Sequence, residues 1–317
     1  IILITHKLRE IMDVTDSVSV MRRGQMTDTV KTSETSPTEL AEMMVGRKVL
    51  LRVDKEPAHP GDVVLDVQNL RVVDDAGVER VKSISFQIRA GEILGIAGVA
   101  GNGQSELLEV LGGMIAAQGG TVTLHNQDID LTGKYSDGQS RRARGIGHVP
   151  EDRQVEGLIM PFEAWENVAF GYHKDPRYQA GILMDNAAIK ADCADKMERY
   201  DVRPPNPRLP ARNFSGGNQQ KIVVAREMDR MPDLLLVGQP TRGVDIGAIE
   251  FIHKQIIALR DQGKAVLLVS VELDEIMGLS DRIAVMFDGK IMGERLPSET
   301  NENELGLLMA GVTEGAA

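Results

Sequence analysis

Alternating apolar and polar residues mark the first strand predicted for the main body of the chain, VVLDVQNLRVV at 63–73. Leu107, Leu108 and Leu111 share one face of a predicted helix that begins at Ser105. Three further short apolar runs predict strands: ISFQI at 84–88, ILGIAG at 93–98 and LLLV at 234–237. A strand, a glycine-rich loop and a helix therefore follow one another, which is the context that a phosphate-binding loop requires.

The chain contains an internal repeat. Residues 1–46 align with residues 266–311 without gaps, and 16 of the 46 pairs are identical. Unrelated sequences of ordinary composition would share about three. The segment L-x-E-I-M-x-x-x-D-x-x-x-V-M-x-x-G starts at Leu8 and again at Leu273. A register kept over this length indicates two tandem copies of one domain.

The repeat suggests a division of the chain into three parts. We interpret residues 1–50 as the C-terminal remnant of a first domain, 51–61 as a linker and 62–317 as a second, complete domain. By subtraction from the length of the repeat, we expect roughly two hundred residues of the first copy to be missing. The remnant would lack the sheet it belonged to, so we expect it to be loosely attached, with Ile2, Leu3 and Ile4 poorly buried.

Composition narrows the classes of partner. The 36 basic and 47 acidic residues give a net charge of −11, which argues against a nucleic-acid partner. The single cysteine, Cys193, excludes an internal disulfide framework and fits a reducing compartment. The longest apolar runs are far too short to cross a bilayer.

Residues 98–105, GVAGNGQS, match a phosphate-binding loop except at one position. The pattern G-x-x-x-x-G-K-[S/T] fits at Gly98, Gly103 and Ser105, but Gln104 stands where the lysine should be. A neutral amide can donate a hydrogen bond to a phosphate but cannot cancel its charge. The residues predicted to bind nucleotide are Gly98, Gly101, Asn102, Gly103, Gln104, Ser105 and Glu106, with Ser105 as the candidate Mg²⁺ ligand.

A second predicted anion site lies at the start of another helix. NFSGGNQQK at 213–221 precedes an amphipathic helix, and Ser215 is placed to cap it. The glycines that follow allow backbone N–H groups to approach a ligand closely. The structural alternative is an ordinary capped helix. Downstream, PDLLLVGQPTRGVD at 232–245 is a buried strand followed by a polar turn.

These motifs, in this order, resemble the ATPase subunits of ATP-binding cassette (ABC) transporters. The similarity is strongest to the second half of the two-domain subunits that serve sugar and nucleoside importers. GHVPEDRQVEGL at 147–158 is similar to the Q-loop region, FSGGN within 213–221 to the signature motif and QPTRGVD at 239–245 to the Walker B and D-loop segment. The resemblance implies a P-loop ABC-ATPase fold, with a mixed α/β sheet core, a small antiparallel β subdomain near 62–90 and a helical arm at about 150–215.

The resemblance also assigns roles in a head-to-tail pair of domains. In the family, each ATP lies between the phosphate loop of one domain and the signature of the other. The signature residues would be Ser215, Gly216, Gly217 and Asn218, and the D-loop residue would be Asp245. They would serve ATP held by the first domain.

Several catalytic positions depart from the family pattern. The Walker B Asp and Glu are replaced by Gly238 and Gln239, and the Q-loop glutamine by Glu151. The repeat aligns the family's switch histidine position with Val271, whereas His6 would be the switch residue of the first domain. A carboxamide is no base at neutral pH, and loss of general-base help alone costs about 10²–10⁴-fold in rate. We expect this domain to bind ATP and Mg²⁺ weakly or not at all, and not to hydrolyse ATP.

The partners follow from the resemblance. They are a first nucleotide-binding domain of the same polypeptide, membrane permease subunits and, indirectly, a solute-binding protein, at the cytoplasmic face of the cell membrane. Residues 156–171, which carry Met160, Phe162 and Trp165, are as a whole the expected docking region for the permease, whereas each of these side chains taken singly is expected to belong to the core of the arm. Basic SRRAR at 140–144 is interpreted as a solvated helix face.

Two alternatives stay open. One is a self-sufficient NTPase with atypical ligands, against which stands the expectation that no carboxylate near Gly238 replaces the missing Mg²⁺ ligand. The other is a soluble, non-transport ABC protein acting on ribosomes or DNA. That class is expected to carry a basic linker or a coiled-coil insert, and the sequence shows neither.

Overall fold

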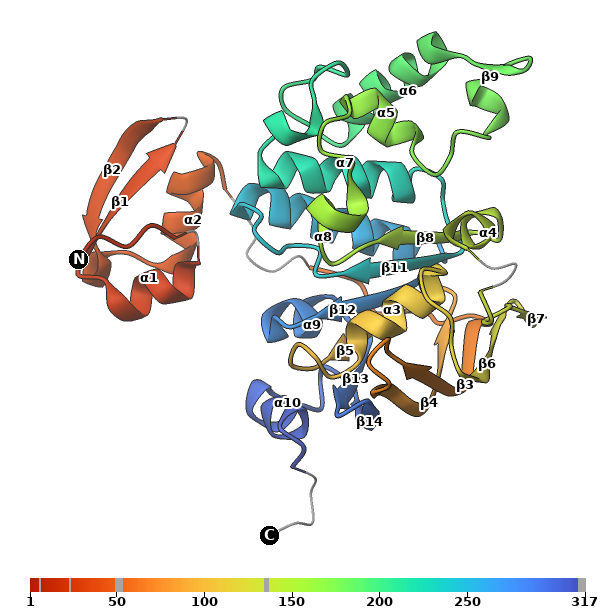
Figure 1. The fold of residues 1–317 in the computed structure, drawn as a ribbon. Helices are drawn as coiled ribbons and strands as arrows, with labels where there is room; N and C mark the ends of the chain where they lie inside the picture. The colour runs from red at the N-terminus through yellow and green to blue at the C-terminus, as the bar shows by residue number, and fades with distance from the viewer. Residues whose placement is uncertain (6, 23, 49–53, 134–136, 313–317) are drawn as a thin grey trace.

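The computed structural model describes residues 1–5, 7–22, 24–48, 54–133 and 137–312 (Figure 1). Its centre is a six-stranded mixed sheet in the order β14-β13-β5-β12-β11-β8. Strands β13, β5, β12, β11 and β8 are parallel, and β14 pairs antiparallel with β13 at one edge. The strand bounds are β5 Ile93–Ala97, β8 Ile146–Val149, β11 Leu234–Gly238, β12 Ala265–Ser270, β13 Arg282–Phe287 and β14 Lys290–Arg295.

Side chains of the central strands alternate between two apolar cores, one on each face of the sheet. Leu234 and Leu236 of β11 point into one core, and Leu235 and Val237 point into the other. This alternation is why strands covered on both faces read as continuous apolar runs. The helices that cover the two faces are α3 Gln104–Gly112 on the first, and α7 Gly216–Met228 and α8 Ile246–Asp261 on the second.

A four-stranded antiparallel sheet, in the order β4-β3-β6-β7, packs against the same core as α3. Its bounds are β3 Val63–Val73, β4 Glu79–Arg89, β6 Gly119–Leu124 and β7 Gln127–Asp128. β3 coincides with the alternating run predicted at 63–73. The mixed sheet core and the separate antiparallel sheet confirm the expected fold class.

The helical arm covers the outer side of α7, at the top of Figure 1. It is built from short elements joined by turns, and α6 is the longest of them. The elements are a π-helical turn η2 Arg153–Gly157, α5 Ala164–Ala169, η3 Pro176–Tyr178, β9 Gln179–Ala180, β10 Leu183–Met184, α6 Asn186–Arg199 and η4 Ala211–Asn213. The remaining helices of the main body are α4 Gly138–Ala143, α9 Leu273–Leu279 and α10 Glu302–Met309.

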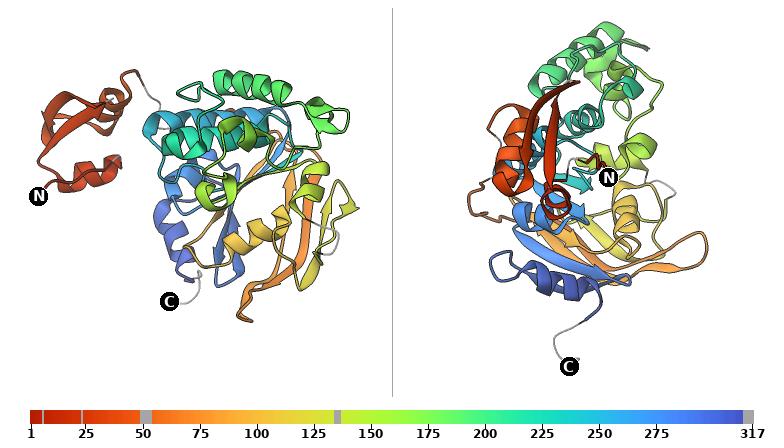
Figure 2. Two further views of the ribbon diagram at one scale, coloured as in Figure 1. Left: turned by 45° about the horizontal axis from the view of Figure 1, so that its top comes forward. Right: turned by 90° about the vertical axis from the view of Figure 1, so that its left-hand side faces the viewer.

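The N-terminal segment folds as a small unit beside the main body (Figure 2). It comprises α1 Leu8–Val14, β1 Ser17–Arg22, β2 Gln25–Lys31, η1 Thr32–Glu34 and α2 Pro37–Val45. α1 and β1 have the same bounds as α9 and β13 when 265 is added to each number. The β1–β2 ladder shifts register between Val20 and Met21, and the β13–β14 ladder shifts between Val285 and Met286, the equivalent pair. The internal repeat is therefore a structural repeat down to this irregularity.

The two copies differ in their surroundings. β13 pairs with β5 inside the central sheet, whereas β1 pairs only with β2 within a two-stranded sheet. Ile2, Leu3 and Ile4 are 92%, 48% and 94% exposed, in agreement with the expectation for this segment. His6, residues 49–53 of the expected domain boundary and linker, and residues 313–317 lie outside the described residues.

The N-terminal unit contacts the main body near the start of α8. Ala41 and Ile246 share a small apolar cluster, and Arg47 forms an ion pair of 2.8 Å with Glu250. In the described part of the chain, no helix is both long enough and apolar enough to cross a membrane.

Candidate functional site

The phosphate loop follows β5 and ends at the first turn of α3, as its sequence predicts. Gly101 and Gly103 have φ values of 90° and 99°, a backbone conformation that residues other than glycine rarely adopt. A Cβ on Gly103 would lie 2.3 Å from the carbonyl oxygen of Arg80, so glycine is required there by space as well. Asn102 Oδ1 accepts a hydrogen bond of 2.8 Å from the backbone N–H of Asp288. The loop is therefore held in a curved shape by its neighbours.

Gln104, in the lysine position, folds back over this loop. Its side chain is buried, and Nε2 donates to the carbonyl of Val99 at 3.3 Å. A Cβ on Gly98 would lie only 2.0 Å from that nitrogen. Gln104 Oε1 is buried and has no hydrogen-bond partner among the described residues. Glu106 lies two residues further along α3, and its Oε1 is 3.9 Å from Arg80 Nε.

Four of the predicted site residues form a continuous row of hydrogen bonds. Ser105 Oγ donates to Glu151 Oε2 in a short contact. Gln239 Nε2 donates to Glu151 Oε1 at 3.5 Å, and Gln239 Oε1 accepts from the backbone N–H of Val271 at 3.3 Å. The row joins α3, the loop after β8, the end of β11 and the end of β12. Three of the five positions that depart from the family pattern, 151, 239 and 271, thus lie in one hydrogen-bonded network.

Gly238 lies at the end of β11 directly beneath the side chain of Glu151. A Cβ on Gly238 would be 2.5 Å from Glu151 Cγ and 2.9 Å from Leu108 Cδ1. The expectation that no carboxylate lies near Gly238 is therefore wrong. It failed because Glu151 belongs to a different strand loop, and only the parallel pairing of β8 with β11 brings the two together.

The chemistry available at this site is limited. Glycine N–H groups of the loop and the start of α3 can bind phosphate oxygens. The Ser105 hydroxyl and the Glu151 carboxylate are hard oxygen donors. Gln239 and the 41%-exposed side chain of Val271 can accept no proton at neutral pH. The site therefore has groups that bind a phosphate but, at 239 and 271, none that would activate a water.

The signature segment forms a complete helix start at α7. Ser215 Oγ accepts from the backbone N–H of Asn218 at 3.4 Å and from its side-chain Nδ2 at 2.8 Å. Ser215 is exposed and Gly216 half-buried, so the first turn is open to a ligand. A Cβ on Gly217 would lie 2.7 Å from Asp245 Oδ2. Asp245 itself caps α8 by accepting from the N–H of Ala248 at 3.0 Å.

Arg153 joins the signature and the D-loop, which sequence reasoning did not foresee. Its guanidinium donates to the carbonyls of Arg242 at 2.6 Å and Gly243 at 3.3 Å. A Cβ on Gly216 would lie 2.6 Å from the same guanidinium. No local pattern marks Arg153, because its partners are about 90 residues away in the chain.

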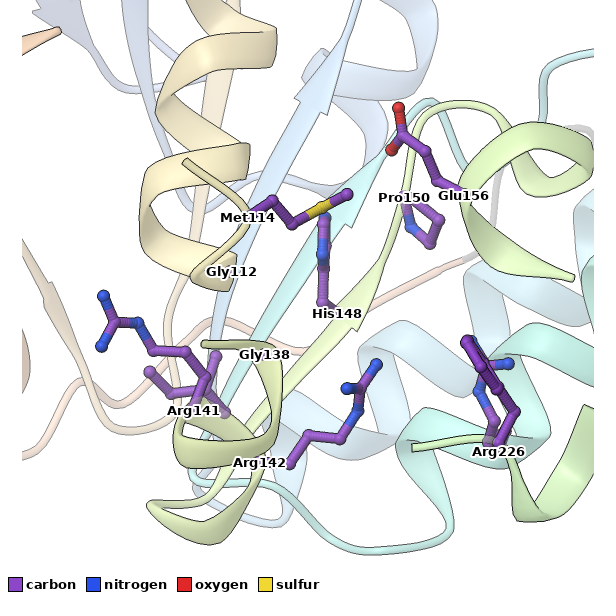
Figure 3. A pocket seen from close by; sticks show the side chains of 11 residues that line it. Gly112, Met114, Gly138, Arg141, Arg142, His148, Pro150, Glu156 and Arg226 are labelled. Carbon is purple, nitrogen blue, oxygen red and sulfur yellow. The ribbon is translucent and has the colours of Figure 1, made fainter. Parts of the chain in front are cut away.

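A cavity of about 230 Å³ opens beside β8, between the C-terminal end of α3, α4 and α7 (Figure 3). Arg141 and Arg142 reach it from α4 and Arg226 from α7, on the other side. Its wall also includes His148 and Glu156. Burial lowers the pKa of His148 to about 4, so its ring is neutral at pH 7.

Charges around this cavity are paired. Burial alone would raise the pKa of Glu227. The nearby Arg226 and Arg142 and the hydroxyl of Tyr172 have the larger combined effect, so the pKa of Glu227 lies below its usual range. Arg226 Nε contacts Glu227 Oε1 at 2.7 Å, and Tyr172 donates to Glu227 Oε2 at 2.7 Å. The carboxylate therefore stays charged inside the protein.

The interpretation of residues 140–144 as a solvated helix face is wrong for Arg141. Arg141 is only 3% exposed and donates to the carbonyls of Leu111 at 3.0 Å and Asp130 at 3.1 Å. A helix end leaves its last carbonyls without partners, and Arg141 supplies donors to the end of α3. Of the expected docking residues, Met160 and Trp165 pack partly against the main core, whereas Phe162 is 43% exposed.

Comparison with known proteins identifies relatives of this chain. The family model described as ABC transporter matches residues 81–242, just over half of the 317 residues. The nucleoside import ATP-binding protein NupA of Lactococcus lactis subsp. cremoris is 48% identical over 98% of this chain and 61% of its own length. The guanosine import ATP-binding protein NupO of Bacillus subtilis is 48% identical over 96% and 59%.

A more distant relative is the glucose import ATP-binding protein TsgD13 of Haloferax volcanii, 40% identical over 100% of this chain and 57% of its own length. The chain thus spans about three fifths of the length of these relatives. Among solved structures, the dimeric bacterial ABC transporter cassette MJ0796 superposes with a TM-score of 0.62 at 23% identity, over 74% of this chain and 98% of that chain. That likeness concerns the fold.

Proposed function

Because the chain belongs to the ABC transporter family, whose members bind ATP with Mg²⁺, we propose that it is the ATP-binding component of an importer for nucleosides or sugars. The names of its curated relatives support this substrate class, since nucleoside, guanosine and glucose import all occur among them. The acidic net charge of −11 speaks against nucleic acid as a partner.

The domain's own phosphate site binds nucleotide weakly and does not turn it over. The loop of Gly98, Gly101 and Gly103 keeps the shape that cradles phosphate, but Gln104 supplies no positive charge. Ser105 and Glu151 offer the oxygen donors that Mg²⁺ prefers, so these residues would hold it against the phosphates and neutralise charge there. Water would still lack a base, because an amide stands at 239.

The observation that carries the proposal is the contrast between this site and the signature. The turn Ser215–Asn218 has its cap, its glycines and an exposed start, whereas Gly238 and Gln239 lack both carboxylates. The signature helix α7 packs on one face of the sheet and the phosphate-loop helix α3 on the other. Because of this placement, we expect the signature to contact ATP that is bound by another domain. Asp245 of the D-loop lies next to Gly217 of the signature and would face the same domain.

That other domain would be a first nucleotide-binding domain of the same polypeptide. The structural repeat supports it: the N-terminal unit has the elements that end this domain, in the same order and register. The pair would act at the cytoplasmic face of the membrane with permease subunits and a solute-binding protein. Residues 156–171 would dock the permease, with Phe162 and Phe170 exposed at 43% and 42%. Phe170 also lines the cavity beside β8.

The position of Glu151 supports one alternative function, a self-sufficient NTPase. A self-sufficient NTPase needs a metal-binding carboxylate, and Glu151 is correctly placed to be one. It also needs a group that polarises water, and neither Gln239 nor Val271 can do so. A measurement of turnover separates the two functions.

The purified chain should show no ATP hydrolysis above that of its Ser105→Ala variant, because phosphoryl transfer depends on the positive charge and the carboxylates that are replaced at 104, 238 and 239. Phosphate release at saturating Mg²⁺-ATP is the measurement. Robust Mg²⁺-dependent turnover that Ser105→Ala removes would favour the self-sufficient NTPase.

A further inference from the structure

The contact between the N-terminal unit and the main body is complementary in charge. Among the described residues, three ion pairs join the two parts, and in each the base lies on the N-terminal unit and the acid on the main body. The pairs are Lys7 with Glu272 at 3.4 Å, Arg9 with Glu302 at 3.8 Å and Arg47 with Glu250 at 2.8 Å. Complementary charges favour one partner and one orientation over others. The contact therefore indicates which kind of surface this face of the main body accepts.

Lys7 and Glu272 occupy the same place in the structural repeat. They are 265 residues apart, which is the offset of the repeat, and they stand immediately before α1 and α9. Two copies of one fold can bring a residue against its own equivalent only where the axis that relates the copies passes close by. Closed pairs of like domains are related by a two-fold rotation. The contact therefore indicates a pseudo-two-fold axis between the N-terminal unit and residues 266–311 of the main body.

The charges beside this axis are reversed between the two copies. Lys7 corresponds to Glu272, and Arg9 corresponds to Asp274. Two identical domains would place Glu272 against the Glu272 of a second copy, because each residue near a two-fold axis meets its own equivalent. Like charges in contact repel each other, whereas Lys7 and Glu272 attract. Repulsion of this kind excludes a wrong partner without weakening the right one.

We propose that the face of the main body around Glu272 and Asp274 accepts a domain of this same fold with basic residues at the equivalent positions, and rejects a second copy of itself. The inference rests on the proposed pairing with a first nucleotide-binding domain and deepens it by naming what keeps the pair unlike. A domain that ends in the N-terminal unit is such a partner, because it carries Lys7 and Arg9. Two main bodies, each with a neutral phosphate site, would then not combine.

A two-fold axis requires each contact to recur with the roles of the two domains exchanged. Ala41 and Val45 of α2 pack against Ile246 of α8, and Ala41 is fully buried there. The equivalents of Ala41 and Val45 on α10 are Gly306, which is half-buried, and Ala310, which is exposed. The inference therefore assigns this side of α10 to α8 of the partner domain.

The first test reverses charges in the full chain and follows docking of the N-terminal unit by the distance between two spin labels. The labels are attached at Gln25→Cys on the unit and Gln262→Cys on the main body, both exposed, whereas Cys193 is buried and stays unlabelled. Lys7→Glu and Glu272→Lys each place like charges together. Because the two side chains are 54% and 57% exposed, the undocked fraction should rise modestly, about fivefold. The two changes combined should restore the wild-type distance distribution.

Lys31→Glu is the matched control. Lys31 lies on the same unit but forms its ion pair within it, with Glu34 at 2.9 Å. The variant changes the net charge by the same amount and should dock as the wild type does. Rescue by the double reversal, with normal docking of the control, supports the inference. A double variant that docks no better than the single variants overturns it, and so does normal docking of both single variants.

The second test measures the choice of partner by sedimentation velocity. Lys7→Glu and Glu272→Lys chains are studied separately and as an equal mixture. Each variant alone opposes like charges and should stay monomeric, whereas the mixture offers complementary charges between chains and should form a dimer. Equal association in the mixture and in the separate variants overturns the charge selection. Because no nucleotide is present, that result leaves the proposed ATP-binding role untouched, and a failure to bind ATP would leave the charge selection intact.

Discussion

Neutral amides stand in the places of charged side chains at 104 and 239, and each donates one hydrogen bond, although Gln104 Oε1 is buried without a partner among the described residues. Gln104 bonds the loop carbonyl of Val99, and Gln239 bridges Glu151 to the backbone of Val271. Buried polar groups without partners are costly, so a site that had simply decayed would be expected to leave more of them. The arrangement points to retained structure with altered chemistry.

His148 beside β8 gives a prediction at the same scale. Burial lowers its pKa from 6.5 to about 4, so the unfolded chain takes up a proton at a higher pH than the folded protein does. Stability should therefore fall as pH falls from about 6.5 to 4, by up to about 3 kcal/mol from this residue. Denaturant titrations at pH 7.5 and 5 compare the wild type with His148→Gln.

The variant should show the smaller loss of stability between the two pH values. An identical loss in the wild type and His148→Gln would contradict the buried, neutral assignment.

At the scale of helices and strands, apolar patterns predicted what depends on local sequence. The strand at 63–73, the buried strand at 234–237 and the cap at Ser215 all lie where the pattern placed them. Contacts between distant segments were not predictable in this way. Glu151 reaches Gly238, and Arg141 reaches the end of α3, only because strand pairing and helix packing bring them together. Such residues look like ordinary surface charges in the sequence.

The structural repeat supplies an internal control for stability. Val20 and Val285 occupy equivalent positions, but β1 has one strand partner and a core of three buried residues, whereas β13 lies inside the central sheet. Backbone amides of β1 should exchange with solvent more than tenfold faster than their equivalents in β13, because fewer apolar contacts oppose local opening. Hydrogen exchange followed by mass spectrometry measures both at once. Equal protection of the two strands would show that the N-terminal unit is integral to the fold.

At the scale of the whole molecule, the positions of the signature turn and the D-loop favour a nucleotide site that is shared with a second domain. Arg153 donates hydrogen bonds to the segment that leads to the D-loop, and its guanidinium lies beside Gly216 of the signature. Under the proposed function, the signature of this domain would complete the ATP site of a partner domain. The two halves of such a pair would then differ in function despite their common fold.

The most direct test is steady-state ATP hydrolysis by this chain joined to a first nucleotide-binding domain, with Ser215→Arg compared against Gln104→Lys. Ser215→Arg should abolish turnover, because a bulky cation would block the γ-phosphate contact. Gln104→Lys should leave turnover nearly unchanged, because 238 and 239 still lack their carboxylates. Asn301→Arg, at the N-cap of α10, controls for the loss of a cap, which costs about 0.5–2 kcal/mol. Normal turnover by a well-folded Ser215→Arg protein would contradict the composite site.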